Sequence, residues 1–446
     1  MNLDLLFAII FYSLILVLFF KYRSRFEVQG KIVALFKTQL GIKWMESISK
    51  KDEQKWLVVL GYILLIAGLI LGVFGFVANH QLWLIVGSFS LFFGLLLAIP
   101  LNLWGHIGTT IGFIGMAVIL FLLVKGTITM LFVADAPPAV APVLPGVSVP
   151  GLPNLSFWHW IVAIFLVATV HEFSHGIWAR LYKIKIKSSG FLFFGPILGA
   201  FVEPEEKELN KKSKPKQLAV FAAGPFSNII FGIFFLLIMN FITGPLYGNV
   251  YEGTGINIQT IIENQPAAQA GLVAPIIIYE INGQKTTDAV QFLNATASLK
   301  PNDKVKVVTD KGSYDLVAGK NPDNESRGFI GVADFTLKAA PKTAIIEKYG
   351  SFLPSAVEWI NMLVFWLVVM NFGIGLFNLL PLGPIDGGRM FLTAMLGIFK
   401  NETKAKKIWG FMSFFCLMLI FINLAPYLWK LLLFILKPFT LLLTLL

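Results

Sequence analysis

The chain has 446 residues, of which 56% are hydrophobic and only 14% are charged. Soluble proteins carry roughly a quarter of charged residues, so this composition excludes a soluble globular protein and indicates an integral membrane protein. The net charge of +11 does not indicate nucleic-acid binding, because the excess Lys and Arg of a membrane protein mostly mark cytoplasmic loops. With Cys416 as its single cysteine, the chain can form neither an intrachain disulfide nor a cysteine metal cluster.

The N-terminal region, residues 1–135, is predicted to cross the membrane about four times. Each of its apolar runs is near the ~20 residues that a spanning helix needs: Leu5–Phe20, Leu57–Ala78, Leu82–Leu103 and Ile107–Val124. The first run lacks the basic start and the cleavage site of a signal peptide, so we expect an uncleaved anchor. Because basic residues follow this run, its N-terminus is expected outside the cell.

Two connecting segments have compositions of their own. Residues 21–56 are strongly basic and contain spaced apolar positions, which predicts an amphipathic helix on the inner membrane surface; these positions include Ile32, Val33, Leu35 and Phe36. Residues 136–157 are rich in proline, which cannot continue a helix. They are therefore predicted to form an extended strap on the membrane surface.

The main chemical signal is a His-Glu-x-x-His motif at residues 171–175, which follows the apolar run Ile161–Val170. Residues four apart share one helix face, so His171 and His175 can direct two imidazoles at one metal ion, for which zinc is well suited. Glu172 can then act as general base on an activated water molecule. The alternative is a group of helix side chains that only neutralise one another. Ionisable groups at membrane depth are costly and usually functional, which favours the metal site.

Residues 158–245 are predicted to form the first half of a catalytic membrane core. After the motif, Ile184–Val202 contains β-prone residues and glycines, which predicts a membrane-associated β hairpin whose edge can hold an unwound substrate. A charged loop follows, and its glutamates at 203–208 are either surface residues or additional ligands. The next span, Gln217–Ile242, carries Ser227 and Asn228, which either face the cavity or serve helix packing.

Residues 250–340 are predicted to form a small soluble α+β insert. Strand-like runs alternate with two short helical segments at Pro266–Leu272 and Thr287–Leu299, and Asn282-Gly283 is a tight-turn signal. This arrangement resembles a PDZ domain. Such domains usually have Gly-Asp before the strand that leads to Ile-Asn-Gly, whereas here Gly271–Pro275 runs directly into it, so the peptide groove is expected to be altered or absent.

Residues 350–446 are predicted to form the second half of the core, with spans at Phe352–Leu380 and Ile408–Leu424 and a tail from Tyr427 that either spans the membrane or lies flat. Asp386 is the candidate third metal ligand, because two histidines leave a catalytic zinc one protein ligand short. It follows a Pro/Gly break at the inner end of a span, so its carboxylate can turn back into the protein. The alternative is that Asp386 caps a helix N-terminus.

The chain resembles the site-2 protease family of intramembrane zinc metalloproteases, particularly its archaeal members. The resemblance covers about residues 136–425 and depends on the HExxHG motif, the PDZ-like insert, the proline strap, Ala200–Pro204, and Asn378-x-x-Pro381 followed by Asp386-Gly387. It implies one Zn²⁺ per chain bound by His171, His175 and Asp386, with Glu172 activating the water. It also implies that Asn378 contacts the substrate backbone, and that the PDZ-like insert screens substrates already trimmed outside the membrane.

We therefore expect an α-helical polytopic membrane protein of about eight spans, with a β hairpin and a PDZ-like insert. The expected activity is hydrolysis of peptide bonds within or near transmembrane helices of membrane proteins. The expected partners are these substrates and the lipid bilayer, without nucleic acid, and the oligomeric state is left open. Counting spans from an outside N-terminus places the active site toward the cytoplasm of a cell-membrane protein and the PDZ-like insert outside.

Two other classes of function fit parts of the sequence. A membrane transporter would use the intramembrane His and Glu residues to bind a metal ion or relay protons, but it predicts internally repeated halves that the sequence lacks. A membrane scaffold acting through the PDZ-like insert would have no need of Glu172.

Overall fold

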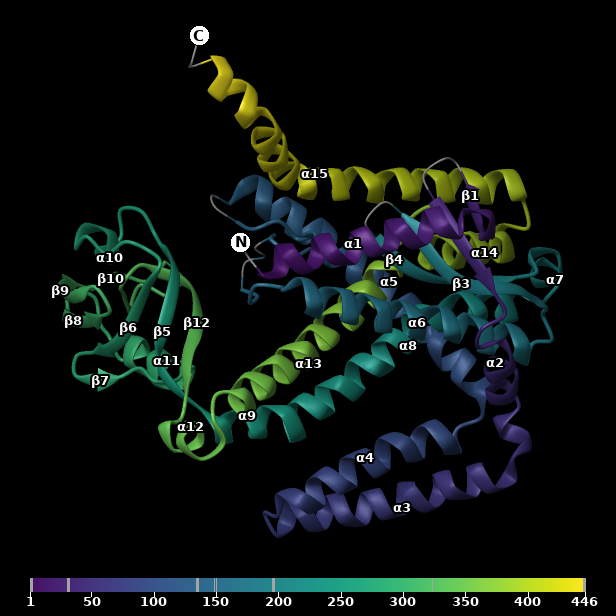
Figure 1. Ribbon diagram of the computed structural model, residues 1–446, viewed down its shortest axis with the longest axis horizontal. Helices are drawn as coiled ribbons and strands as arrows, with labels where there is room; N and C mark the ends of the chain where they lie inside the picture. Colours follow the sequence, from purple (N-terminus) through teal and green to yellow (C-terminus); the bar gives the residue numbers. More distant parts are fainter. Residues whose placement is uncertain are drawn as a thin grey trace. The chain divides into compact units, whose positions relative to one another are not determined.

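The computed structural model describes residues 3–29, 33–133, 136–147, 149, 151–194, 197–322 and 324–443. The chain forms two units, shown in Figure 1. The first unit comprises Met1–Val147, Leu155–Phe241 and Leu363–Leu446, and the second comprises Ser148–Asn154 and Ile242–Met362.

Eight helical segments in the described part of the chain are long and apolar enough to cross a membrane. They contain α1 (Leu3–Lys21), α3 (Lys55–Val77), α4 (Gln81–Ala98), α5 (Leu101–Phe132), α6 (Phe157–Leu181), α8 (Lys214–Ile238), α13 (Phe352–Phe377) and α15 (Glu402–Leu443). The predicted polytopic helical fold is confirmed. The predicted tail after Tyr427 continues α15 without a break as far as Leu443.

The junction between α4 and α5 lies a few residues before its predicted place. Pro100 ends the first helix, because proline removes a backbone donor and clashes with the preceding turn. The ammonium group of Lys51 donates to the carbonyls of Leu96, Leu97 and Ile99, at 3.0, 3.1 and 2.7 Å. The neighbouring carboxylate of Asp52 accepts from the Leu101 N–H at 2.9 Å. This pair of side chains satisfies main-chain groups that both helix ends would otherwise leave open.

The predicted amphipathic helix over residues 21–56 is wrong for most of its length. Phe26–Gln29 (β1) and Val33–Thr38 (β2) are strands. Among the described residues between the end of α1 and the start of α3, helix is limited to the eight residues of α2 (Ile42–Ser49) and to two 3-10 turns, Arg23–Arg25 and Lys51–Glu53. Ile32 lies outside the described residues. The apolar spacing suited a strand equally well, and the deciding factor is a partner strand far away in the sequence.

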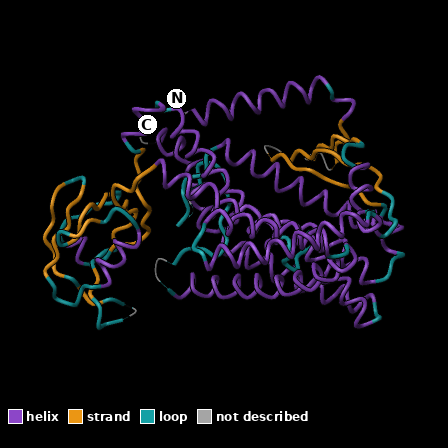
Figure 2. Tube along the Cα trace, turned by 90° about the horizontal axis from the view of Figure 1, so that it is seen from below, coloured by secondary structure: helices purple, strands orange, loops and turns teal. Residues whose placement is uncertain are grey.

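That partner is the predicted hairpin, which is present as β3 (Ile186–Phe194) and β4 (Ile197–Pro204). The two N-terminal strands extend it into a four-stranded antiparallel sheet with the order β1-β2-β3-β4. Gly190 allows β2 to approach closely, because a Cβ there would collide with the Phe36 carbonyl oxygen. Figure 2 shows strands in orange and helices in purple.

The core of the first unit lies where α6 packs on α8 and β4, and where α8 also contacts α5 and α14 (Asp386–Phe399). Its buried side chains include Trp178, Tyr182, Ala222, Leu379 and Met390. The short helix α7 (Glu206–Asn210) follows β4, so the predicted charged loop is partly helical.

A buried amide fastens the proline-rich strap to the helices. The described residues between Ala136 and Asn154 contain no helix or strand. The Ala139 N–H donates to Oδ1 of Asn423 on α15 at 2.7 Å. Nδ2 of Asn423, which is fully buried, donates to the Thr127 hydroxyl on α5 at 2.6 Å. One side chain thus joins the strap, α5 and α15.

The second unit is the predicted α+β insert. Its six-stranded antiparallel sheet contains β5 (Tyr251–Ile261), β6 (Ile276–Ile281), β7 (Gln284–Lys285), β8 (Lys304–Thr309), β9 (Gly312–Val317) and β12 (Val332–Pro341). A two-stranded pair, β10 (Gly319–Lys320) and β11 (Gly328–Phe329), and the helices α10 (Pro266–Gln269) and α11 (Ala289–Ala297) accompany it. Asn282 and Gly283 have φ of 51° and 76°, as the predicted tight turn requires. The insert is flanked in the chain by α9 (Gly244–Val250) and α12 (Thr343–Tyr349).

Candidate active site

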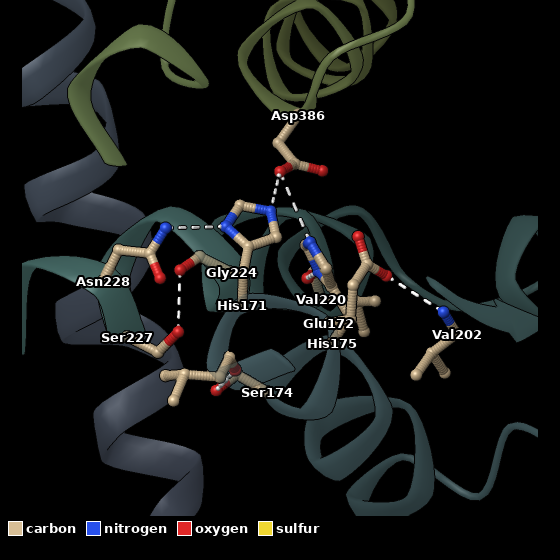
Figure 3. A network of polar contacts seen from close by, with 11 residues as sticks. His171, Glu172, Ser174, His175, Val202, Val220, Gly224, Ser227, Asn228 and Asp386 are labelled. Carbon is tan, nitrogen blue, oxygen red and sulfur yellow. Dashed lines mark hydrogen bonds and ion pairs between the residues drawn. The ribbon is translucent and has the colours of Figure 1, made fainter. Parts of the chain in front are cut away.

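The His-Glu-x-x-His motif lies in the C-terminal half of α6, whose first turn is capped by Ser156. One helical turn separates His171 and His175, so both rings project from the same face, with their centroids 4.9 Å apart. Both histidines are buried, at 7% and 9% exposure. Figure 3 shows the two rings turned toward the carboxylate of Asp386.

Asp386 comes from the distant helix α14 and completes the cluster. Its Oδ2 lies 2.9 Å from Nε2 of His171 and 3.3 Å from Nε2 of His175. Ile385 is the N-cap of α14, so Asp386 is the first helical residue and not the cap. The Gly387 N–H donates to the Asn378 carbonyl at 2.7 Å, and a Cβ on Gly387 would collide with the backbone at Leu379. Glycine at this position therefore lets the loop fold closely enough to present Asp386.

The tautomer of His175 follows from its hydrogen bond to the main chain. Nδ1 of His175 lies 2.7 Å from the Val220 carbonyl oxygen, which can only accept, so Nδ1 carries the ring proton when the imidazole is neutral. The lone pair of Nε2 then faces Asp386. A bare carboxylate would repel that lone pair, whereas a cation between them would attract both.

Asn228 on α8 is the corresponding partner of His171. Its amide Nδ2 lies 3.0 Å from Nδ1 of His171, and its Oδ1 is buried with no hydrogen-bond partner among the described residues. Rotating the amide by half a turn exchanges the two atoms, so that Oδ1 accepts the proton of Nδ1. In that arrangement the Asn228 oxygen is satisfied, and Nε2 of His171 also has its lone pair free.

These contacts form a donor set that fits a divalent metal ion. Each of the residues His171, His175 and Asp386 offers one ligand atom. These three atoms lie within 4.8 Å of one another. Two imidazole nitrogens and one carboxylate oxygen are ligands that zinc accepts in sites with an open fourth position. Gly224 on α8 leaves room for them, since a Cβ there would overlap Nε2 of both rings.

The carboxylate of Asp386 suits either a protonated ring or a metal cation beside it. Burial would raise the pKa of this carboxyl, but when the two rings are protonated, their charge and hydrogen bonds outweigh burial and hold that pKa below its usual range. A metal cation beside neutral rings would favour the ionised carboxylate in the same way.

Glu172 lies beside this cluster and faces the hairpin. Its Oε2 accepts from the Val202 N–H of β4 at 3.0 Å (Figure 3), and its Oε1 has no main-chain partner in the part of the chain that the structure describes. One strand of the sheet thus fixes the carboxylate next to the two histidines.

The structure also places the remaining candidate, Asn378, near Asp386. The carbonyl of Asn378 accepts from Gly387, while its half-buried side chain has no hydrogen-bond partner among the described residues. The sequence had left the role of Asn228 open, and it did not reveal that Val220 and Val202 contribute main-chain groups. These partners become visible only when the helices are packed.

A family model described as Peptidase family M50 matches residues 159–420, which is more than half of the chain. An uncharacterized protein of Methanocaldococcus jannaschii is 32% identical over 234 residues, covering 51% of this chain and 54% of the relative. A putative zinc metalloprotease of Clostridium perfringens is 26% identical over 298 residues, covering 56% of this chain and 86% of the relative. The chain thus spans about half the length of the first relative and most of the second.

Among solved structures, the PDZ domain of an SdrC-like protein from Listeria monocytogenes is similar to part of this chain. It shares 25% identity, covers 19% of this chain and 87% of that domain, and has a TM-score of 0.17.

Proposed function

Since the chain belongs to peptidase family M50, we propose that it is an intramembrane zinc metalloprotease of the site-2 protease type. Its substrates are membrane proteins, which it cuts within or near their transmembrane helices. The observation that carries this proposal is the convergence of His171, His175 and Asp386 from two distant helices, with Glu172 fixed beside them. The putative zinc metalloprotease of Clostridium perfringens supports zinc as the metal.

His171, His175 and Asp386 would hold one zinc ion per chain, and the hydrogen bonds to Asn228 and Val220 would orient the two rings. When bound, zinc polarises the scissile carbonyl and makes a water molecule more acidic. The protein residues supply the rest of the chemistry.

Glu172 is the general base and then the general acid. It takes a proton from the water that attacks the carbonyl carbon, and it delivers that proton to the leaving nitrogen when the C–N bond breaks. The bond from the Val202 N–H to Oε2 holds the carboxylate in place during both transfers. Proton transfer therefore needs no further side chain.

A helical substrate has to unwind before it can react, because its carbonyls are engaged in helical hydrogen bonds. β4 ends the sheet order, so one edge of this strand has no partner strand in the described part of the chain. An unwound substrate segment would pair with that edge beside Glu172, as peptides do when they extend a sheet. Asn378 would contact the backbone of the same segment.

The direct test is cleavage by the full-length protein, purified in detergent with zinc supplied. A panel of purified single-span membrane proteins serves as the probe, and mass spectrometry locates the cuts. We expect cleavage within or next to the spans, and its loss in Glu172→Gln with the zinc content unchanged. Equal cleavage by Glu172→Gln would overturn the role of Glu172, and an uncut panel would count against the protease function.

We further propose that the active site faces the cytoplasm and that the second unit lies outside, where it screens substrates already trimmed by another protease. The lysine-rich connection between α6 and α8 supports this orientation. In a Cys416→Ala background, Lys211→Cys should react with an impermeant maleimide only after cells are opened, whereas Ser298→Cys should react in intact cells. The reverse pattern would invert the orientation.

A further inference from the structure

A small apolar cavity lies beside Glu172, on the side of Val202. Its volume is about 160 Å³, and Glu172 is the only charged residue among the described residues that line it. Phe165 of α6 and Phe191 of β3 form part of its wall and stack with their ring centroids 6.1 Å apart.

The opposite part of the wall comes from the N-terminal segment 38–45, which lies outside the region that matches the M50 family model. Three large apolar side chains of this segment, Leu40, Trp44 and Met45, line the cavity. The cavity is thus assembled from the family core and from residues that precede it in the chain.

Side-chain hydrogen bonds hold the start of this segment on β3. The Thr38 hydroxyl donates to the Ser189 carbonyl at 3.0 Å, and the Ser189 hydroxyl donates to the Leu40 carbonyl at 2.7 Å. Nearby, Nε2 of Gln39 donates to the Lys187 carbonyl at 2.9 Å. These side-chain bonds are additional to the main-chain pairing of β2 with β3. They extend the attachment of the segment to β3 beyond the end of β2.

The end of the segment is fixed on α6, the helix that carries Glu172. Met45 is 2% exposed and packs so closely on Gly176 that a Cβ there would overlap its sulfur. One residue later, Oε2 of Glu46 lies 2.6 Å from Nη2 of Arg180. Trp44 and Leu40 are nevertheless 72% and 70% exposed, so they form an apolar rim of the cavity. The backbone that carries this rim is held in place by the contacts with β3 and α6.

We propose that this cavity receives a large apolar side chain of the substrate, from a residue that flanks the scissile bond, and that Leu40, Trp44 and Met45 make the N-terminal segment part of substrate selectivity. This inference rests on the proposed protease function. A general base acts within about 3 Å of the water that attacks the carbonyl. Because neighbouring Cα atoms are about 3.8 Å apart, a side chain flanking that carbonyl can reach the cavity beside Glu172.

The size and lining of the cavity identify the class of side chain. An apolar cavity of about 150 Å³ in another protein accommodates benzene, so about the same space suits leucine or phenylalanine. Alanine would leave most of it empty. Leucine and phenylalanine are abundant in transmembrane helices, in agreement with the proposed substrates.

The test uses the zinc-loaded, full-length protein and a single-span membrane protein that it cuts. The residues on either side of the mapped cut are changed in turn to Ala, Val, Leu and Phe, and kcat/KM is measured for each substrate. Binding of the same labelled substrates to Glu172→Gln gives a readout that does not depend on turnover. Leu40→Ala and Trp44→Ala test the rim, and Trp56→Ala is the matched control because Trp56 is also exposed and lies outside the lining.

We expect the parent to prefer Leu or Phe over Ala at one flanking position by roughly tenfold or more. Leu40→Ala and Trp44→Ala should lower this ratio roughly fivefold, both in kcat/KM and in binding to the inactive variant, while Trp56→Ala leaves it unchanged. Ala200→Leu, which fills the cavity from β4, should shift the preference toward Ala.

The outcomes separate the two proposals. Cleavage with no side-chain preference, or a preference that Leu40→Ala, Trp44→Ala and Ala200→Leu leave intact, would overturn the selectivity role and leave the protease function standing. A uniform loss for all substrates would show that the segment is only structural. If the zinc-loaded parent cuts none of the membrane proteins, both the protease function and this inference fall.

Discussion

Oδ2 of Asp386 lies 2.9 Å from Nε2 of His171, although 215 positions separate the two residues in the chain. If this contact marks a three-ligand zinc site, the purified protein should bind about one zinc per chain. Asp386→Ala and His175→Ala should both lose the metal, as measured by elemental analysis after zinc loading and gel filtration. Asp315→Ala, which removes an exposed carboxylate in the second unit, should retain it. Full zinc content in a folded Asp386→Ala variant would refute the ligand assignment.

Gly224 should be intolerant of even one methyl group. A Cβ at this position would overlap Nε2 of both histidines, so Gly224→Ala should displace the rings and weaken zinc binding roughly 10- to 100-fold, as the loss of ligand-orienting contacts does. The rate of zinc loss to a chelator measures the effect. Gly397→Ala is the matched control, because a Cβ on that helical glycine meets no atom within 4 Å. Equal rates in the two variants would contradict the prediction.

Asn228 should act through its oxygen as acceptor of the His171 ring proton. Asn228→Ala is expected to weaken zinc binding roughly 10- to 100-fold, and Asn228→Asp should restore much of it because a carboxylate also accepts. Competition with a fluorescent zinc indicator measures both affinities. Asn240→Ala removes an exposed amide whose bond stays within its own helix and should change nothing. Poor binding by Asn228→Asp and normal binding by Asn228→Ala would be the opposite of this expectation.

The buried Lys51 should make stability depend on alkaline pH. Burial lowers the pKa of Lys51 below its ordinary value of 10.5, against the opposing charge of Asp52. Between the lowered pKa and 10.5 the unfolded chain holds more protons at this site than the folded chain, so the free energy of unfolding rises with pH. The denaturation midpoint of the parent in detergent, relative to that of Lys51→Met, should therefore increase as the pH approaches 10.5.

The exposed neighbour Lys55 provides the control for this measurement. Lys55→Met removes an exposed ammonium group instead, and the change of its denaturation midpoint with pH is compared with that of Lys51→Met. A constant difference between the parent and Lys51→Met across the range would show that Lys51 contributes hydrogen bonds to the three carbonyls at the end of α4 but no linked proton.

The spanning helices and the insert could be predicted because their signals are local. Apolar runs near the length of a membrane crossing identify helices such as α3 and α13, and Asn282-Gly283 specifies its own turn. The helical period likewise places His171 and His175 on one face. These features depend on the chemistry of neighbouring residues, and no distant partner has to be known.

Features that depend on distant partners could not be predicted in the same way. β2 becomes a strand because Val33 through Thr38 pair with Phe194 through Ser189, more than 150 positions later. The sequence 33–38 alone was equally compatible with an amphipathic helix. Asn228 has no distinguishing neighbour in the sequence either, and its contact with His171 follows only from the packing of α6 on α8.

The contact between Ala139 and Asn423 has a consequence for the order in which the protein is assembled. These residues are 284 positions apart, and at roughly 5–20 residues per second the ribosome needs roughly 15 to 60 s to make the intervening chain. Until then the strap lacks this hydrogen bond, and Thr127 on α5 lacks its amide partner. These two contacts of the N-terminal half can therefore form only after α15 has been synthesised. A chain that ends before α15 leaves the Ala139 N–H without this acceptor and the Thr127 hydroxyl without this donor.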